Sequence, residues 1–318
     1  MINLEGVRVK VPASTANLGP GFDTLGMALS LFAWLELKPA PKTVFRLYGE
    51  EMKGVAKDKS NLIYEVAQKV FDEAGVSVPE LEISMASEIP LARGLGSSAS
   101  AIVGALYAAN ELIGAPLSAE KLFEMATALE KHPDNVGASL FGGIISAVWD
   151  GSSANHVRIE PPADLEVLVA IPSFQLSTAK ARQVLPDRIT MEDAVFNVSR
   201  ASLLTGALAA GRLDLIAAAM RDRMHQPYRA PLIPGMERIL EEATDHGALG
   251  AALSGAGPTL LALTERGAGR RDELAAFLQN VLADHGISAK MLWLSPSTEG
   301  VRKLLPEEKI PFAAESLV

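Results

Sequence analysis

The chain has 318 residues, of which 48% are hydrophobic and 21% charged, and its net charge is −9. This length and apolar content predict a folded enzyme with two domains, each able to bury its own core, and exclude a disordered chain. The acidic balance argues against nucleic acid and anionic membranes as partners. The absence of cysteine excludes disulfides, thiolate metal sites and a cysteine nucleophile.

No targeting or membrane segment is expected from the sequence. Residues 1–6 lack a basic region followed by an apolar one, as a signal peptide would need. The longest uncharged run, from Gly247 to Thr264, is interrupted by glycines and Pro258 and is too short to span a bilayer. Together with the lack of cysteine, these features predict a soluble, cytoplasmic protein.

In the first half, the hydrophobic pattern predicts a mixed succession of strands and helices. Alternating apolar residues indicate half-buried strands, and apolar residues three and four apart indicate amphipathic helices. The expected strands are 7–11, 33–38, 44–49, 81–86, 142–149 and 157–160. The expected helices are 61–74, about 97–113 and a further one that begins at Ser118.

The second half continues this mixture. The run 165–171 is nearly all apolar, so it is expected to be a central strand, and 249–254, 260–263 and 290–294 are further strands. Helices are expected at 190–210, 213–220, 236–246 and 271–285. Thr190 should cap the first of these, with Val195, Val198 and Leu204 on one side. Because the helices and strands do not alternate strictly, the predicted class is α+β with two layers.

The most informative segment is Leu91–Ser100, which reads LARGLGSSAS and runs directly into an apolar helix. Gly94 and Gly96 allow a tight turn in which main-chain N–H groups point into one small volume. The start of the helix near Ser97 adds unpaired N–H groups and the positive end of a helix dipole. These features predict a phosphate cradle, with Ser97 and Ser98 at its rim. An ordinary turn that caps a core helix is the alternative.

Two better-known phosphate motifs are excluded. The P-loop pattern G-x-x-x-x-G-K-[ST] does not occur in the chain. Residues 94–99 match the loose dinucleotide pattern G-x-G-x-x-[GA], but that fold needs a second strand after the helix. Here a second helical pattern follows from Ser118, so the segment does not form a βαβ unit.

A second polar segment, Pro12–Asp23, reads PASTANLGPGFD and follows the first expected strand. Because it is rich in glycine, proline and small residues, we expect it to be irregular. Asn17 offers donors and acceptors and Asp23 a carboxylate, which suits ligand binding. A structural loop in which Asp23 caps a helix is the alternative.

Four further segments are candidates. Glu130–Asn135 (EKHPDN) is a dense polar cluster at a helix end, where one carboxylate would suffice for Mg²⁺, although the cluster could instead stabilise the helix end. The small residues of Gly250–Thr259 permit close approach of a backbone or a ligand. Thr178–Arg182 and Arg223–Arg229 are basic islands, and their arginines suit a carboxylate or phosphate unless they are solvated surface charges.

Three separated motifs resemble the signature motifs of the GHMP small-molecule kinases: Pro12–Asp23, Pro90–Ala99 and Leu253–Thr259. Within that family the chain is similar to the homoserine kinases, through residues 16–23, 132–136, 178–182 and 227–229. The resemblance extends from about Val7 to Ser295. Three motifs in this order and spacing are far more specific than the glycine loop alone.

The resemblance implies the two-domain α+β fold of the GHMP kinases, with a ribosomal-protein-S5-domain-2-like N-terminal domain and a C-terminal ferredoxin-like α/β sandwich. The expected boundaries are 1–160 for the ATP-binding domain and 161–318 for the C-terminal one. It also implies that ATP and Mg²⁺ bind at the N-terminal domain and that L-homoserine binds between the domains. The expected assembly is a homodimer.

The resemblance further implies roles for individual residues. The ATP phosphates would be held by the loop Pro90, Leu91, Ala92, Arg93, Gly94, Leu95, Gly96, Ser97, Ser98, Ala99 and Ser100, with Asn61 near the adenine. Mg²⁺ would be held by Ser98 and Glu130. The substrate pocket would consist of Asn17, Asp23, His132, Asp134, Asn135, Arg182, Arg229, Gly255 and Gly257. In it, Asp23 would face the ammonium group, and Arg182 and Arg229 the carboxylate.

Two departures from the family pattern concern the metal site and its neighbour. The family usually has a glycine after the glutamate and Val-Ala-Pro after the Asp-Asn pair, where this chain has Lys131 and 136–138 (VGA). Neither change removes a functional group. Lys131, however, brings a positive charge next to Glu130.

The expected reaction is direct attack of the homoserine γ-hydroxyl on the γ-phosphate of ATP, because phosphoryl transfer needs mainly positioning and charge neutralisation. It gives O-phospho-L-homoserine and ADP, a step of threonine biosynthesis. Asn17, Asp134 and Asn135 are the expected catalytic residues, and the proton acceptor is Asp134 or a phosphate oxygen. The alternatives are a mevalonate- or shikimate-type kinase of the same family and a catalytically silent metabolite-binding regulator.

Overall fold

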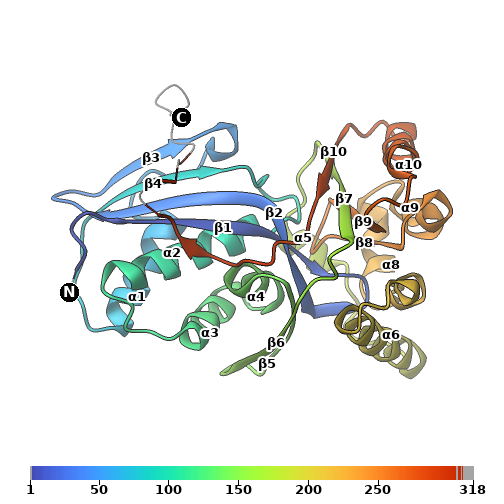
Figure 1. The fold of residues 1–318 in the computed structure, drawn as a ribbon, viewed down its shortest axis with the longest axis horizontal. Coiled ribbons are helices and arrows are strands. Elements are labelled where there is room, and N and C mark those ends of the chain that lie inside the picture. The colour runs from blue at the N-terminus through green and yellow to red at the C-terminus, as the bar shows by residue number, and fades with distance from the viewer. Residues whose placement is uncertain (1, 306, 309, 311–318) are drawn as a thin grey trace.

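Two β-sheets, each with its own helices, lie side by side in the computed structural model, which describes residues 2–305, 307, 308 and 310 (Figure 1). In Figure 1 the larger sheet lies above helices α1 to α4, and the smaller sheet lies between it and helices α9 and α10. Helices and strands are mixed along the chain without strict alternation. The predicted α+β class is therefore confirmed.

The larger sheet is built from the first part of the chain and from one short strand near its end. Its order is β11-β1-β2-β4-β3, and β5 and β6 continue from β2. All neighbours are antiparallel except β3 and β4. The strands are β1 (Val7–Asn17), β2 (Gly21–Pro39), β3 (Val44–Tyr48), β4 (Leu81–Ser87), β5 (Ile144–Trp149), β6 (Ala154–Ile159) and β11 (Arg302–Lys303).

The segment Pro12–Asp23 is a β-hairpin, so the prediction that it is irregular is wrong. β1 runs through Asn17 and β2 begins at Gly21, which confines the turn to three residues. The end of β1 is buried on both faces, and only small side chains fit there. The small residues thus indicate close packing, and the β1–β2 pairing shifts register between Pro12 and Ala13 and between Ala16 and Asn17. Asp23 lies in β2 and caps no helix.

Four helices cover the lower face of this sheet as drawn in Figure 1: α1 (Leu62–Glu73), α2 (Ser97–Leu112), α3 (Ala119–Glu130) and α4 (Asp134–Phe141), with a 3₁₀ turn η1 at Glu50–Met52. The side chains of Asn61 and Ser118 cap α1 and α3 by accepting backbone N–H groups. α2 packs against α1, α3, α4 and β1. The sequence did not predict α4, so the cluster Glu130–Asn135 joins two helices rather than ending one.

The smaller sheet has the order β10-β7-β9-β8 and is antiparallel throughout. Its strands are β7 (Leu165–Pro172), β8 (Gly250–Leu253), β9 (Leu260–Glu265) and β10 (Ala289–Leu294). β7 is buried along its whole length, because its alternate side chains enter two different cores. Val167 and Val169 join the core of the larger sheet, whereas Leu168 and Ala170 pack beneath α9 and α10. The predicted central position of this strand is confirmed.

The remaining helices flank the smaller sheet. They are α5 (Thr178–Gln183), α6 (Met191–Ala209), α7 (Ile216–Ala219), α8 (Gln226–Arg229), α9 (Met236–Glu242) and α10 (Arg271–Asp284), with 3₁₀ turns η2 (Leu213–Leu215), η3 (Ala230–Leu232) and η4 (Ala243–His246). Thr190 caps α6 as expected. The expected apolar side of α6 is only half right, because Val195 and Val198 are 60% and 66% exposed while Leu204 is buried.

The chain returns to the larger sheet after crossing the smaller one. β11 pairs with β1, so the chain after β10 contacts the N-terminal part of the molecule as well as the C-terminal part. The boundary between 160 and 161 falls in the connection from β6 to β7 and stays a prediction. None of the described helices is long and apolar enough to cross a membrane.

Candidate active site

A cavity of about 590 Å³ lies between the two halves of the molecule and receives residues from both. Most of the predicted site residues line it. They are Asn17, Asp23, Asn61, Leu91, Ala92, Gly94, Gly96, Ser97, Ser98, Glu130, His132, Asp134, Asn135, Arg182, Arg229, Gly255 and Gly257. The chain therefore brings together segments that are more than 200 residues apart in the sequence.

The glycine loop is held by hydrogen bonds to four successive carbonyl oxygens. The carbonyl oxygens of residues 92 to 95 accept hydrogen bonds, in order, from Leu176 N (3.2 Å), Thr259 N (3.3 Å), Ser254 Oγ (2.5 Å) and Ser14 N (3.2 Å). In a trans peptide the N–H of the next residue points the opposite way from the carbonyl. The N–H groups that follow these carbonyls thus point away from the four donors, which suits an anion cradle.

The loop leads into the N-terminus of α2, where the first N–H groups have no partner within the helix. No side chain among the described residues caps this end. Gly94 has φ +80°, and a Cβ there would clash with the backbone of Ser254, so only glycine fits. The loop can approach the C-terminal part closely for this reason, and its N–H groups remain available to an anion.

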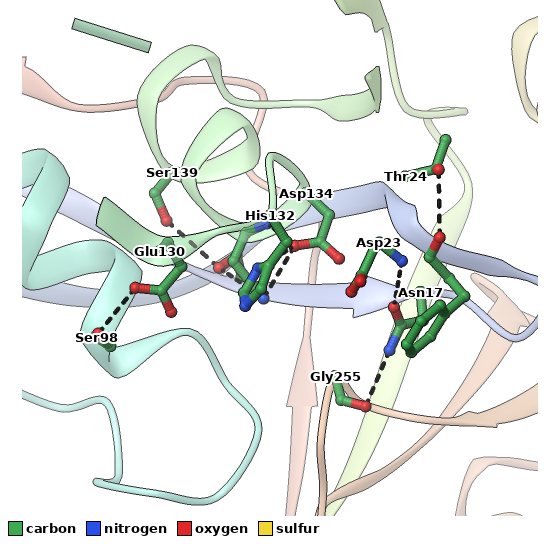
Figure 2. A network of polar contacts seen from close by, with 12 residues as sticks. Asn17, Asp23, Thr24, Ser98, Glu130, His132, Asp134, Ser139 and Gly255 are labelled. Carbon is green, nitrogen blue, oxygen red and sulfur yellow. Dashed lines mark hydrogen bonds and ion pairs between the residues drawn. The ribbon is translucent and has the colours of Figure 1, made fainter. Parts of the chain in front are cut away.

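Ser98 and Glu130 meet at one wall of the cavity, with Ser98 Oγ 3.0 Å from Glu130 Oε2 (Figure 2). Ser98 lies in the first turn of α2, and Glu130 is the last residue of α3. No group of three or more acidic, histidine or cysteine residues that could hold a metal occurs in the described part of the chain. This pair is a hydroxyl and one carboxylate beside a phosphate cradle, which suits Mg²⁺ because that ion keeps several non-protein ligands.

Asp134 is the centre of a second polar group at the start of α4 (Figure 2). Its side chain is almost fully buried, and Oδ1 accepts hydrogen bonds from the N–H of Asn135 (2.6 Å) and from His132 Nδ1 (3.0 Å). The amide oxygen of Asn135 accepts a hydrogen bond from Ser14 Oγ (3.0 Å). These contacts engage only Oδ1 of the Asp134 carboxylate. They hold the side chains of Asp134 and Asn135 at the cavity wall.

Asn17 fixes the shape of the hairpin end. Its Oδ1 accepts the N–H of Asp23 (3.0 Å), and its Nδ2 donates to the carbonyl of Gly255 (3.0 Å) (Figure 2). Both Asn17 (φ +72°) and Asp23 (φ +54°) have left-handed backbones, which are uncommon for residues other than glycine. Such strain is typical of functional segments that the surrounding structure holds in place.

Asp23 and Arg182 form a two-pronged ion pair across the cavity. Arg182 Nη1 and Nη2 donate to the two carboxylate oxygens of Asp23 at 3.0 and 2.7 Å. Asp23 comes from β2 and Arg182 from α5, so the pair joins the two halves of the molecule. The family resemblance implied that these residues bind opposite charges of one ligand, whereas in this structure they neutralise each other.

Arg229 is only 2% exposed, yet its partners are all neutral. Its Nε donates to the carbonyl of Ala181 (3.1 Å), and its Nη1 donates to the carbonyl of Gly255 (3.1 Å) and to His225 Nδ1 (3.1 Å). Among the described residues no carboxylate pairs with it. Burial and the nearby charge of Arg182 lower the pKa of Arg229 to about 10. A buried positive charge that faces a cavity favours an anionic ligand.

Five predicted ATP-binding residues do not line the cavity: Pro90, Arg93, Leu95, Ala99 and Ser100. The Arg93 side chain points to the end of β7, where it donates to the carbonyls of Pro172 (2.9 Å) and Ser173 (2.8 Å). It therefore holds the loop against the C-terminal part. Asn61 lines the cavity, but its amide already caps α1 and donates to the carbonyl of Ala56 (2.6 Å).

The sequence analysis missed the apolar end of the cavity. This end is formed by residues from η1 to α1, from β4 and from α2, namely Met52, Val55, Ala56, Leu62, Ile63, Met85 and Ala101. Leu176, Ser177 and Thr178 line the opposite wall. Apolar side chains have no chemical signature in the sequence, so only the preference of planar ligands for apolar pockets could have suggested them.

Family models match both halves of the chain: the GHMP kinases N terminal domain over residues 61–143 and the GHMP kinases C terminal domain over 204–287. The homoserine kinase of Deinococcus radiodurans is 45% identical over 284 residues, which are 89% of this chain and 92% of that protein. That of Carboxydothermus hydrogenoformans is 41% identical over 94% of this chain and 97% of its own length. The chain belongs to the homoserine kinase family of the GHMP kinases.

Solved structures agree with this membership. A homoserine kinase from Cytophaga hutchinsonii matches with a TM-score of 0.85 and 27% identity, covering 94% of this chain and 97% of that one. A mevalonate kinase matches with a TM-score of 0.68 at 16% identity, which shows the shared GHMP fold alone. The predicted two-part GHMP kinase fold is thus confirmed.

The family's usual glycine after the glutamate has a backbone explanation. Lys131 ends α3 with φ +73°, a left-handed conformation that glycine adopts without cost. The Lys131 side chain is exposed and does not line the cavity. Lys131 therefore affects the neighbouring Glu130 through its strained backbone conformation and not through a side chain in the cavity.

His132 gives a testable pH dependence of stability. Burial disfavours its charged form, but the hydrogen bond and charge of Asp134 outweigh this effect and raise the pKa of His132 above its ordinary value. A raised folded pKa adds stability that is fully present below the unfolded pKa of about 6.5 and is lost as the pH rises through the folded value. We expect wild type to be more stable than His132→Gln by a larger margin at about pH 6 than at about pH 9. Urea unfolding of both proteins at each pH gives the free energies of unfolding. An equal difference between wild type and His132→Gln at the two pH values would contradict the prediction.

Proposed function

We propose that this protein transfers the γ-phosphate of ATP to the side-chain hydroxyl of L-homoserine, giving O-phospho-L-homoserine and ADP. The observation that supports this best is the buried Arg229, which bonds no carboxylate among the described residues and shares one cavity with the glycine loop. A phosphate cradle at one end and an unpaired cation at the other suit ATP and an acidic acceptor. The named relatives are homoserine kinases, which supports the same substrate.

The charges around Arg229 suit a zwitterion rather than a simple acid. In the free protein Arg182 pairs with Asp23. An amino acid can give each member of this pair a new partner of opposite charge. Its carboxylate binds Arg182 and Arg229, and its ammonium group binds Asp23. A substrate without an ammonium group would leave Asp23 unpaired, which costs free energy in a partly buried site.

The nucleotide occupies the other end. The N–H groups of the glycine loop and of the first turn of α2 bind the phosphates, and Met52, Ile63 and Met85 contact the base. Asn61 supports this wall through its cap on α1. Ser98 and Glu130 would hold Mg²⁺, and that ion would neutralise charge that develops on the phosphate oxygens.

Asn17 and Asn135 orient the acceptor hydroxyl. One hydrogen of the Asn17 amide remains after its bond to Gly255, and Asn135 cannot accept a proton. The hydroxyl oxygen forms a bond to the γ-phosphorus while the bond from that phosphorus to the departing ADP oxygen breaks. The proton passes to a phosphate oxygen or to Asp134, whose Oδ2 takes no part in the contacts with His132 and Asn135.

The wider assignment follows from this function. Residues 1–160 form the ATP-binding domain and 161–318 the second domain, and Gly255 and Gly257 close the cavity between them. The protein acts in threonine biosynthesis in the cytoplasm, as a homodimer. Of these points, the place in threonine biosynthesis is supported by the names of the homoserine kinase relatives.

An ADP-release assay with Mg-ATP tests the proposal. We expect release that depends on L-homoserine and stays at background without an acceptor. A metabolite-binding regulator would give no release with any acceptor. A mevalonate- or shikimate-type kinase would give release with those acids and none with homoserine.

A further inference from the structure

His225 is completely buried between the hairpin turn and Arg229, and none of the assigned roles includes it. It precedes α8 in the basic island Arg223–Arg229. Its ring lies against Phe22, with centroids 5.1 Å apart. A buried imidazole needs partners for both ring nitrogens, and these partners define its protonation state.

The two contacts of the ring assign one tautomer. Nε2 lies 2.7 Å from the carbonyl oxygen of Gly19, which can only accept, so Nε2 bears the proton. Nδ1 lies 3.1 Å from Nη1 of Arg229, which can only donate, so Nδ1 is the acceptor. The imidazole is therefore neutral and links two groups that come from opposite halves of the molecule.

The surrounding charges agree with a neutral ring. Burial lowers the pKa of His225, the charge of Arg229 lowers it further, and Asp222 and Asp23 oppose this shift only in part. Asp222 does not bond the ring, since its Oδ2 is 3.6 Å from Nε2. It accepts instead the backbone N–H groups of His225 (3.0 Å) and Gln226 (2.7 Å) and so fixes the backbone from which the ring projects.

The turn that His225 contacts is itself pressed against the C-terminal part. Gly19 has φ +86°, and a Cβ there would clash with the backbone of Met220. The side chain of Asn197 also donates to the carbonyl of Pro20 at 3.4 Å. Two links join the hairpin end that includes Asn17 and Asp23 to Arg229: the Gly255 carbonyl, which accepts from both Asn17 Nδ2 and Arg229 Nη1, and the His225 ring, which contacts both Gly19 and Arg229.

We propose that His225 is a positioning residue for the amino-acid pocket: its Nε2–H holds the turn at Gly19 while its Nδ1 orients the guanidinium of Arg229. The contact sets the separation between the groups that bind the ammonium and the carboxylate of the acceptor. This proposal deepens the proposed function and rests on it for the identity of the acceptor. It predicts that loss of either ring contact weakens homoserine binding and leaves ATP binding unchanged.

Three substitutions separate the two contacts. His225→Phe keeps a ring of similar size and removes both. His225→Asn places an amide near the Nδ1 position and keeps an acceptor for Arg229, whereas His225→Gln places an amide near the Nε2 position and keeps a donor for Gly19. His246→Phe is the matched control, because His246 also stacks on an aromatic ring but lies outside the cavity.

Steady-state kinetics with each substrate varied is the first readout. We expect His225→Phe to raise the KM for homoserine roughly 10- to 100-fold, the size of one lost hydrogen bond to a charged group, with the KM for ATP unchanged. His225→Asn and His225→Gln should each recover part of this loss, and they replace the phenylalanine variant if it does not fold. Unchanged homoserine KM, or an equal rise for both substrates without recovery by the amides, would overturn the proposal.

A spectroscopic readout is independent of the acceptor's identity. The chain has five histidines, so the ¹⁵N signals of His225 can be assigned by their loss in His225→Phe. We expect a neutral imidazole with the proton on Nε2 near pH 7. A charged ring or a proton on Nδ1 would overturn the proposal even if homoserine proves not to be the substrate. A wild-type protein that is inactive on homoserine but shows this tautomer would contradict the proposed function alone.

Discussion

Glu130→Ala is expected to lower kcat by at least roughly 100-fold. Substitution of a residue that only hydrogen-bonds a metal ligand already costs about 10- to 100-fold in metal affinity or activity, and Glu130 is assigned as a ligand itself. In the part of the chain that the structure describes, Glu130 is the carboxylate that bonds Ser98 beside the glycine loop. Its loss removes charge stabilisation that matters most in the transition state, so the KM for homoserine should change less than kcat. Initial rates at increasing Mg²⁺ measure this, and Ser98→Ala should show a weaker effect of the same kind.

Glu124→Ala is the matched control for this prediction. Glu124 lies on the same helix, α3, but does not line the cavity. It should keep near-normal turnover at every Mg²⁺ concentration. Normal turnover of Glu130→Ala at ordinary Mg²⁺ would contradict the metal assignment, and a defect in Glu124→Ala instead would move the assignment to that residue.

Arg182→Ala is expected to lower kcat/KM for homoserine by roughly 10- to 150-fold, because a hydrogen bond to a charged group is worth about 1.5–3 kcal/mol. The loss should appear mostly as a raised KM if Arg182 binds the carboxylate equally in the ground and transition states. The substitution also leaves Asp23 without its ion-pair partner. The KM for ATP should barely change, since Arg182 lies outside the glycine loop.

Arg188→Ala provides the control for the arginine prediction. Arg188 follows α5 at an exposed position and does not line the cavity. It should leave both KM values unchanged. If Arg182→Ala and Arg229→Ala folded and kept the wild-type KM for homoserine, these arginines would not bind the carboxylate, and the zwitterion assignment would fail.

The sequence predicted the local elements of the phosphate end well, because their signals are local. The glycine pair, the run of apolar residues after Ser97 and the caps at Ser118 and Thr190 all act within a few residues. The strand at 165–171 was equally clear, since burial on both faces favours a nearly continuous apolar run, which Glu166 alone interrupts.

The errors arose where distant parts of the chain meet. Pro12–Asp23 looked irregular because its small residues were taken as turn formers, whereas they fit a strand enclosed on both faces. On α6, Val195 and Val198 suggested a buried apolar side that the structure exposes, because the buried apolar residues Leu204, Ala207 and Leu208 all lie in the C-terminal half of the helix. Side-chain periodicity shows which residues share a face but not what covers that face.

Within the candidate site, residue types could be predicted but not their partners. Asp23 and Arg182 are 159 positions apart, and no sequence pattern indicates that they pair when no ligand is bound. Likewise, Arg93 looked like a phosphate ligand by its place in the loop, yet its side chain turns toward β7. The contact of His225 with Gly19 spans 206 positions and was not foreseen at all.

A competition experiment tests the central claim most directly. L-homoserine, mevalonate, shikimate and galactose are supplied together at equal concentration with limiting Mg-ATP, and the phosphorylated products are identified by ³¹P NMR and mass spectrometry. We expect O-phospho-L-homoserine to account for nearly all of the transferred phosphate. A product mixture dominated by any of the other three alcohols would contradict the assignment of Asp23, Arg182 and Arg229 to an amino-acid substrate.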